Sequence, residues 1–297
     1  MSAKRTLLSA VLCSFWLLSG GCSKPAPPQA SFFAAEKRFL EICREEFHYP
    51  IFTNSLNNTL WIYLPAEDSI IALAASPRQP APAPSSSPAA SLQHVKAKLS
   101  DGIFTIRYDI LHTRKYSEDT GYSSVYSKKY QERQNNVFSA MSRAFPDGDE
   151  KQIPDFFVLV IADIANGIKT ESIFYFRDFK KAMSIPPSLP QEEFAKRYLS
   201  RLRGDPSIVG DRTGKHLNLE EMTWSEFLAR QLENRIRFKY QQSSFPPSDD
   251  NVGEILKIVA ELVSAYDFQD FQSVRLEDLA SGQTYLADKS QLEMNSK

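Results

Sequence analysis

Four histidines are the residues of this sequence best suited to acid–base chemistry or metal binding. They stand singly, at His48, His94, His112 and His216, with no His-Glu-x-x-His pair and no close histidine or cysteine partner. A zinc site needs three or four such ligands in one place, so tertiary structure alone would have to assemble it. No Gly-x-Ser-x-Gly motif supports a hydrolase nucleophile. The sequence therefore implies no catalytic residue, metal or cofactor.

Two loops have the composition of ligand sites but not the spacing. The segment Gly210–His216 resembles a phosphate loop, yet Val209 stands where the first glycine belongs and His216 replaces the hydroxyl residue that would hold magnesium. Residues 147–150 carry three carboxylates, but an EF-hand requires an acid or amide where Lys151 stands and glycine one place later. We interpret the first as a turn and the second as a solvated loop.

The N-terminus has the three parts of a signal peptide. Met1–Arg5 carries two cations and no acid, Leu7–Leu18 is apolar, and small residues follow. The apolar run is about 12 residues, whereas a helix needs about 20 to cross a bilayer. Residues 1–21 are therefore predicted to direct export and to be removed.

Gly20 and Gly21 stand directly before Cys22, and a polar, proline-rich run follows over residues 23–28. This pattern resembles the lipobox of bacterial lipoproteins, with Ser19 at the place where that family usually has leucine. The resemblance covers residues 1–24 and implies that Cys22 is lipidated and becomes the mature N-terminus. It also implies a membrane-anchored protein of the cell envelope that faces the periplasm, and Ser23 after the cysteine implies sorting to the outer membrane. The alternative is an ordinary cleaved signal peptide that leaves a plain thiol.

Cysteine content and charge agree with export. Once Cys13 is removed and Cys22 is modified, only Cys43 remains, so no internal disulfide can form. Removing residues 1–21 takes away two cations and leaves 33 against 36 acidic residues, a net charge of −3. Such a balance lacks the basic excess that a nucleic-acid partner would require.

Proline-rich composition divides the chain. Residues 22–30 are predicted to be a lipid tether, and residues 76–91 lack the apolar content to order themselves. Only about 45 residues lie between them, close to the lower limit for an independent domain. We therefore predict a single domain over 31–297 with a disordered insertion at 76–91.

Apolar periodicity predicts the regular elements, and turn chemistry separates them. Asn57-Asn58, Ser100-Asp101-Gly102 and Asn166-Gly167 are predicted hairpin turns. Thr223 and Glu226 form a capping box that begins a helix. Helices are expected at 31–47, 190–203, 224–241 and 250–266, with another that ends near residue 145, and strands at 50–54, 59–64, 95–99, 103–111, 155–164 and 170–177.

One internal similarity bears on the fold class. The same seven-residue pattern occurs at Ile161–Gly167 and at Leu276–Gly282: an apolar residue, any residue, Asp, an apolar residue, Ala, a small polar residue and Gly. Each copy follows a predicted helix. Convergence on turn chemistry and duplication both explain it. In either case the recurring unit is a helix followed by a β-hairpin, which predicts an α+β domain with a largely antiparallel sheet.

Aromatic residues suggest where a partner could bind. Trp61 and Tyr63 share one face of a predicted strand, opposite Leu60, Ile62 and Leu64, so one of the two faces could meet a ligand or partner instead of the core. The leading hypothesis is a non-enzymatic, lipid-anchored envelope protein that binds another envelope component. The alternatives are an exported hydrolase with a site assembled from distant residues, and a carrier of a small ligand or lipid, which would need a cavity of several hundred Å³.

Overall fold

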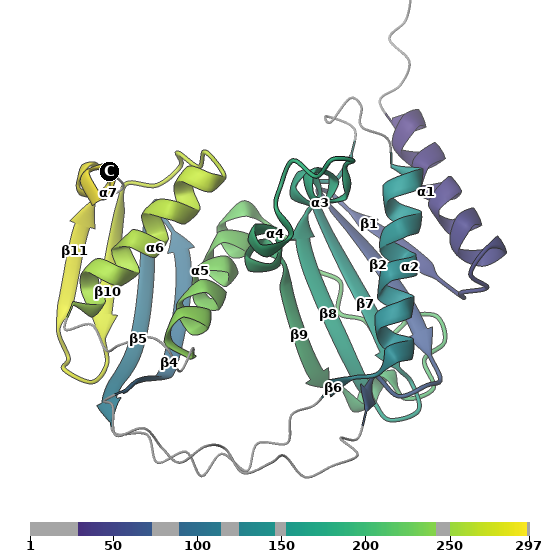
Figure 1. Cartoon of the computed structure of the whole chain (residues 1–297), viewed down its shortest axis with the longest axis horizontal. Helices are drawn as coiled ribbons and strands as arrows, with labels where there is room; N and C mark the ends of the chain where they lie inside the picture. Colours follow the sequence, from purple (N-terminus) through teal and green to yellow (C-terminus); the bar gives the residue numbers. More distant parts are fainter. Residues whose placement is uncertain (1–28, 73–88, 114–124, 146–152, 242–249, 296–297) are drawn as a thin grey trace, which may run out of the picture.

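The computed structural model describes residues 29–72, 89–113, 125–145, 153–241 and 250–295, which form two sheets with helices packed on them (Figure 1). The larger sheet has the strand order β1-β2-β7-β8-β9, and the smaller has the order β11-β10-β5-β4. A short two-stranded sheet pairs β3 with β6. Six of the eight strand pairings are antiparallel, which confirms the predicted α+β class with a largely antiparallel arrangement.

The elements follow one another in an order that interleaves the two sheets. The strands are β1 (Phe52–Leu56), β2 (Thr59–Ala66), β3 (Ile71–Ala72), β4 (Ala89–Ser100), β5 (Ile103–Thr113), β6 (Val125–Tyr126), β7 (Phe156–Asp163), β8 (Ile168–Tyr175), β9 (Leu199–Gly204), β10 (Ser273–Asp278) and β11 (Thr284–Asp288). The helices are α1 (Gln29–Glu45), α2 (Lys128–Ala144), α3 (Phe176–Met183), α4 (Gln191–Arg197), α5 (Trp224–Gln241), α6 (Asn251–Ala265) and α7 (Lys289–Asn295), with a 3-10 turn at Pro206–Ile208.

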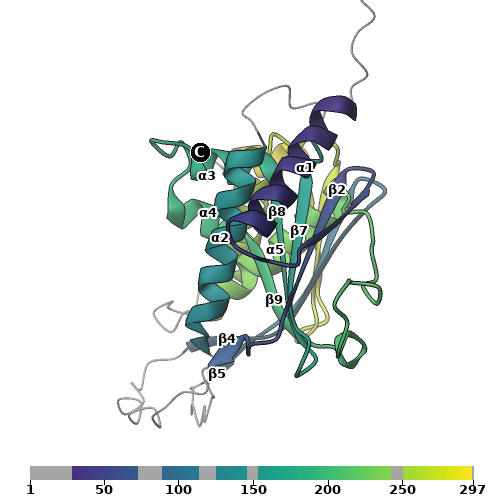
Figure 2. The ribbon, with the colours of Figure 1, turned by 90° about the vertical axis from the view of Figure 1, so that its right-hand side faces the viewer.

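Strand β7 lies at the centre of the larger sheet, and all eight of its residues are buried, as its continuous apolar run predicts. One face, with Phe157, packs under α1 and α2, which lie in front of the strands in Figure 2. The other face, with Phe156, joins a core shared with α5, α6 and the smaller sheet. Figure 1 shows α5 between the two sheets. Burial of both faces explains why β7 lacks an alternating polar pattern.

Four strands of the larger sheet, β1, β2, β7 and β8, have the same topology as the four strands of the smaller sheet. In each, an antiparallel hairpin (β1-β2 or β4-β5) is followed by a parallel pairing (β2 with β7, or β5 with β10) and a second hairpin (β7-β8 or β10-β11). The similar segments Ile161–Gly167 and Leu276–Gly282 form the turns of the second hairpins, the same place in both sheets. The chain order interleaves the hairpins of the two sheets, which a tandem copy of one sheet would not produce, so the shared place of the turns does not decide between convergence and duplication.

The two aspartates of these turns make the same contacts. Asp163 Oδ1 accepts the amides of Ala165 at 3.2 Å and Asn166 at 3.0 Å, and Asp278 Oδ1 accepts those of Ala280 at 2.9 Å and Ser281 at 3.4 Å. The glycines that close both turns have positive φ angles, 66° and 71°, which glycine adopts without strain.

Replacement of Asp163 by asparagine is expected to lower the free energy of unfolding by about 1–3 kcal/mol. Asp163 is fully buried, and its Oδ2 accepts a hydrogen bond from the Asn166 side-chain amide. Asp278→Asn is the matched control and should cost no more than about 1 kcal/mol, since Asp278 is partly exposed. Urea unfolding of the two variants measures both values. A stabilised Asp163→Asn protein would contradict a turn role for Asp163.

Several boundaries differ from the sequence-based expectation. The predicted helix at 190–203 ends at Arg197, and Leu199–Gly204 instead forms β9, which pairs with β8. The predicted strand 170–177 ends at Tyr175, where α3 begins. Pairing with β8 depends on a distant part of the chain, so local periodicity did not indicate β9.

The targeting and linker segments lie almost entirely outside the described residues. These segments are the predicted signal peptide at 1–21, the predicted tether at 22–30 and the proline-rich segment at 76–91. The described exceptions are Gln29 and Ala30, which begin α1, and residues 89–91, which begin β4. Among the helices of the described residues, none is long and apolar enough to cross a bilayer.

Candidate binding groove

The strand face that carries Trp61 and Tyr63 is covered by the chain itself. The two side chains are 7% and 3% exposed. The Trp61 indole donates to the carbonyl of Glu220 at 2.9 Å, and the Tyr63 hydroxyl donates to the carbonyl of Asp211 at 2.6 Å. Residues 205–222 therefore lie over these rings, and both faces of β2 are buried. The structure places neither ring on an exposed surface.

The loop that resembles a phosphate site is filled by its own carboxylate. Asp211 accepts the backbone amides of Thr213 at 3.0 Å, Gly214 at 2.9 Å and His216 at 3.0 Å. Burial works against the charged form of Asp211, but these amides outweigh it and hold its pKa below the usual value. The amides that a phosphate would use are thus already occupied, in agreement with the predicted turn.

The histidines do not converge where the structure describes them. His48 follows α1, His94 lies on β4 and His216 lies in the loop after Asp211, and all three side chains are exposed. The side chain of His112, the acidic loop at 147–150 and Cys22 lie outside the described residues. Within the described part of the chain, no group of three or more histidine, cysteine, aspartate or glutamate side chains is placed to hold a metal.

Cys43 is a buried thiol of α1, packed in the core under α1 and α2. Burial raises its pKa to about 12, with opposing charge effects from Arg44 and Glu46. A thiol with such a pKa stays protonated at neutral pH and is a poor nucleophile. Its role is that of a small apolar side chain.

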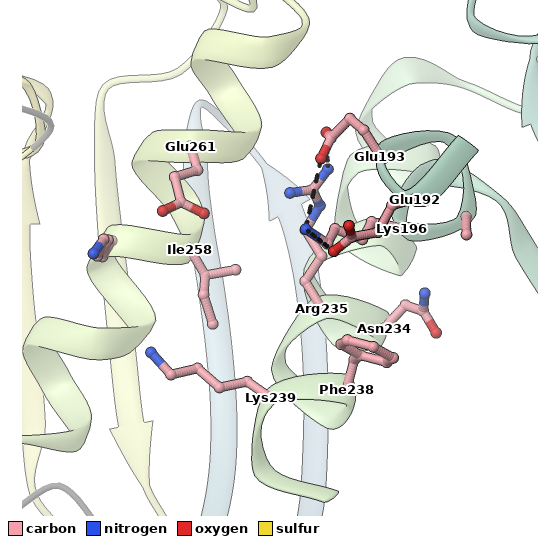
Figure 3. A pocket seen from close by; sticks show the side chains of 11 residues that line it. Glu192, Glu193, Lys196, Asn234, Arg235, Phe238, Lys239, Ile258 and Glu261 are labelled. Atoms are coloured by element: carbon pink, nitrogen blue, oxygen red, sulfur yellow. Dashed lines mark hydrogen bonds and ion pairs between the residues drawn. The ribbon is translucent and has the colours of Figure 1, made fainter. Parts of the chain in front are cut away.

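A groove opens on the surface where three helices meet (Figure 3). Its volume is about 400 Å³, and we call it the α4–α5–α6 groove. Figure 3 shows Ile258 extending from α6 toward α5, Lys239 extending from α5 toward α6, and Arg235 with Glu193 between α5 and α4. The groove is lined by Glu192, Glu193, Ala195, Lys196, Asn234, Arg235, Phe238, Lys239, Lys257, Ile258 and Glu261.

Phe238 is the apolar residue that marks this groove. Helix α5 buries a stripe through Leu232, Ile236 and Tyr240, which faces the core. Phe238 lies two residues from Ile236, about 200° around the helix, so it points away from that stripe and is 55% exposed. Capping of α5 by Thr223, whose hydroxyl accepts the Glu226 amide at 3.2 Å, sets where the helix begins. An aromatic ring outside the stripe was the sequence signal that could have indicated this site.

Charged side chains of both signs lie on each side of the groove. On the α4 side, Glu193 pairs with Arg197 at 2.9 Å and with Arg235 at 3.5 Å. On the α6 side, Lys239 forms an ion pair with Glu254 and lies near Lys257. Burial lowers the pKa of Lys239, and the neighbouring Lys257 lowers it further. The groove therefore presents apolar surface between two sets of charges.

A buried polar cluster lies behind the α4 side. Asp178 is 3% exposed, and its Oδ1 lies 3.1 Å from Nη1 of Arg197. The guanidinium carbon of Arg197 lies 5.3 Å from the ring centre of Tyr266. Gln231 donates to the Arg197 carbonyl. Burial raises the pKa of Asp178, and Arg197 opposes that rise. These contacts join α3, α4 and α5 to Tyr266 at the end of α6. Arg197, held by Asp178, in turn positions Glu193 through their ion pair.

A second cavity of about 400 Å³ lies between the outer edges of β4 and β9. Here Glu233 of α5 accepts the Ala97 amide at 3.0 Å, and Arg237 donates to the Val95 carbonyl at 3.2 Å. Helix α5 thus satisfies backbone groups of β4 that a strand partner would otherwise use. These contacts make the cavity a structural junction, whereas the α4–α5–α6 groove combines an exposed aromatic ring with apolar and charged walls.

Comparison of this chain with protein-family models, with curated proteins and with solved structures finds no match.

Proposed function

We propose that this chain is a lipid-anchored protein of the bacterial cell envelope, held to the membrane through Cys22, that binds another envelope protein and has no enzymatic activity of its own. The N-terminal pattern of cations, apolar run and small residues before Cys22 supports the anchor. Ser23 after the cysteine supports an outer-membrane location facing the periplasm. Nucleic acid is not the partner, since a net charge of −3 offers no attraction to phosphates.

Exposure of Phe238 is the observation that carries the binding function. Sites that dominate protein–protein affinity are commonly aromatic or arginine side chains in a pocket, surrounded by polar groups that exclude water. The α4–α5–α6 groove has this composition, with Phe238, Ala195 and Ile258 inside a ring of charged side chains. A protein that presents an apolar side chain flanked by charges of both signs would complement it.

A photo-crosslinking side chain at Asn234, within the groove, tests this proposal in the intact envelope. We expect a discrete adduct with a second protein. We also expect Phe238→Glu to reduce the yield of this adduct at least about tenfold, because the variant places a charge where the partner would bury an aromatic ring. The matched control is Val209, which is 57% exposed and does not line the groove. Val209→Glu should leave the adduct unchanged.

Three other outcomes would contradict the proposal. An adduct with a lipid or small molecule would favour the carrier hypothesis. Equal adducts from Asn234 and from a crosslinker at Val209 would mean that contact is not specific to the groove. No adduct from Asn234 in a folded, membrane-associated protein would remove the groove as the binding site.

A further inference from the structure

Strand β11 is the sheet edge with the least protection. Exposed edges invite pairing with another chain, and native proteins block them with charges, bulges or covering elements. At the other edge of the smaller sheet, α5 covers β4 through Glu233 and Arg237. In the larger sheet, β9 carries Arg201 and Arg203, and the exposed side chains of β1 are polar.

The exposed apolar residues of the smaller sheet gather on the β10-β11 hairpin. Leu286 is 56% exposed, Tyr285 is 42% exposed, and Leu279 in the turn is 51% exposed. No charged residue occurs in β11 before Asp288 at its end. Among the described residues β11 pairs only with β10, so its outer edge is uncovered there.

Hydrogen bonds show which backbone groups face outward. The Asp278 amide donates to the Gln283 carbonyl at 3.0 Å, and the Lys289 amide donates to the Gln272 carbonyl at 3.0 Å. Because antiparallel pairs alternate, residues 285 and 287 bond to β10 while 284, 286 and 288 point away from it. The Asp288 amide is already bonded to Gln291 Oε1 at 3.0 Å. The amides and carbonyls of Thr284 and Leu286 and the carbonyl of Asp288 remain directed outward.

We propose that two copies of this chain pair antiparallel through β11, with Leu286 on the two-fold axis. In this register Leu286 exchanges both backbone hydrogen bonds with Leu286 of the second copy, and the Thr284 amide donates to the Asp288 carbonyl of the other strand. The two Leu286 side chains become direct cross-strand neighbours, which apolar residues favour. Thr284 faces Asp288, so no like charges meet. The free outward amides of β11, those of Thr284 and Leu286, thus all find backbone acceptors, and the Thr284 carbonyl alone lacks a backbone donor because the Asp288 amide stays with Gln291. The two four-stranded sheets become continuous.

Cysteine substitution tests both the pairing and its register. With Leu286→Cys, the two thiols face each other across a hydrogen-bonded pair whose Cα atoms are about 5.5 Å apart, which a disulfide can span. Mild oxidation of the full-length protein in its membrane should therefore produce a covalent dimer. Thr284→Cys is the matched control on the same strand, because the two copies of residue 284 would be about 13 Å apart, beyond disulfide reach.

Sedimentation of the detergent-solubilised protein gives an independent measure. The unsubstituted chain should sediment as a dimer, and Leu286→Lys should weaken self-association at least about tenfold by placing two ammonium groups together on the axis. Leu286→Cys protein that is folded but does not crosslink would overturn the proposal. Equal crosslinking by Thr284→Cys would overturn the register, and dimers that survive Leu286→Lys unchanged would overturn the interface.

Discussion

Replacement of Arg197 by methionine is expected to lower the free energy of unfolding by about 3–5 kcal/mol at neutral pH, the range observed when one partner of a buried ion pair is removed. The Asp178 side chain is 4% exposed and would be left without its cation. Urea unfolding measures the loss. Lys196→Met is the matched control, since Lys196 pairs with Glu192 and Glu193 at the surface and should contribute less than about 1 kcal/mol.

The pH dependence of the Arg197→Met variant provides a second check. Burial raises the pKa of Asp178 in the folded protein, and removal of Arg197 takes away the charge that opposes this rise. A carboxyl group whose folded pKa exceeds its unfolded value binds its proton more tightly when folded, so acidification through that raised pKa favours folding. The penalty of Arg197→Met should therefore shrink as the pH falls from neutral.

The variant Asp178→Asn is expected to rescue Arg197→Met, because it removes the buried negative charge that has lost its partner. Recovery of most of the lost stability in the double variant would assign the penalty to this charge. If Arg197→Met costs no more than Lys196→Met, or if its penalty grows on acidification, the cluster does not hold α3 and α4 against α5 and α6 in the way described.

Replacement of Cys22 by serine is expected to release the protein from the membrane and to abolish its labelling with a fatty acid. A single acyl chain binds membranes marginally, whereas the two or three chains of a lipoprotein anchor firmly, so loss of the acceptor cysteine should be nearly all-or-none. Cell fractionation measures the change. Cys43→Ser is the matched control, because that thiol is buried in the fold and its loss should leave the protein in the membrane fraction.

A Cys22→Ser protein that stays membrane-bound and uncleaved would show that Leu7–Leu18 acts as a signal anchor. Release of the unsubstituted protein into the periplasm, without lipid, would support the ordinary cleaved signal peptide. Either result would remove the anchor from the proposed function, but neither would bear on the α4–α5–α6 groove.

Local chemistry explains the parts of the fold that could be predicted from the sequence. Helix α5 begins at Trp224 because Thr223 caps it, and its buried stripe repeats at helical spacing. The hairpin turn at residues 57–58 follows from the tolerance of asparagine for positive φ, which is 48° at Asn57. In each case the residues that set the structure are neighbours in the chain.

Contacts between distant segments account for what could not be predicted. The parallel pairings of β2 with β7 and of β5 with β10 interleave the two sheets, and no local pattern indicates them. Trp61 is covered by residues 205–222, a segment with little regular structure and no apolar period. The α4–α5–α6 groove likewise depends on how α4 and α6 pack beside α5. The sequence could have suggested it only through Phe238, an aromatic residue outside the buried stripe of α5.

The mass of the mature N-terminal peptide, from protein extracted out of the membrane, tests the lipid-anchored assignment most directly. The assignment predicts that residues 1–21 are absent and that the peptide begins at Cys22 with a diacylglycerol group on its sulfur and mass shifts characteristic of attached acyl chains. A peptide that begins at Met1, or one that begins near residue 22 and carries an unmodified thiol, would contradict it.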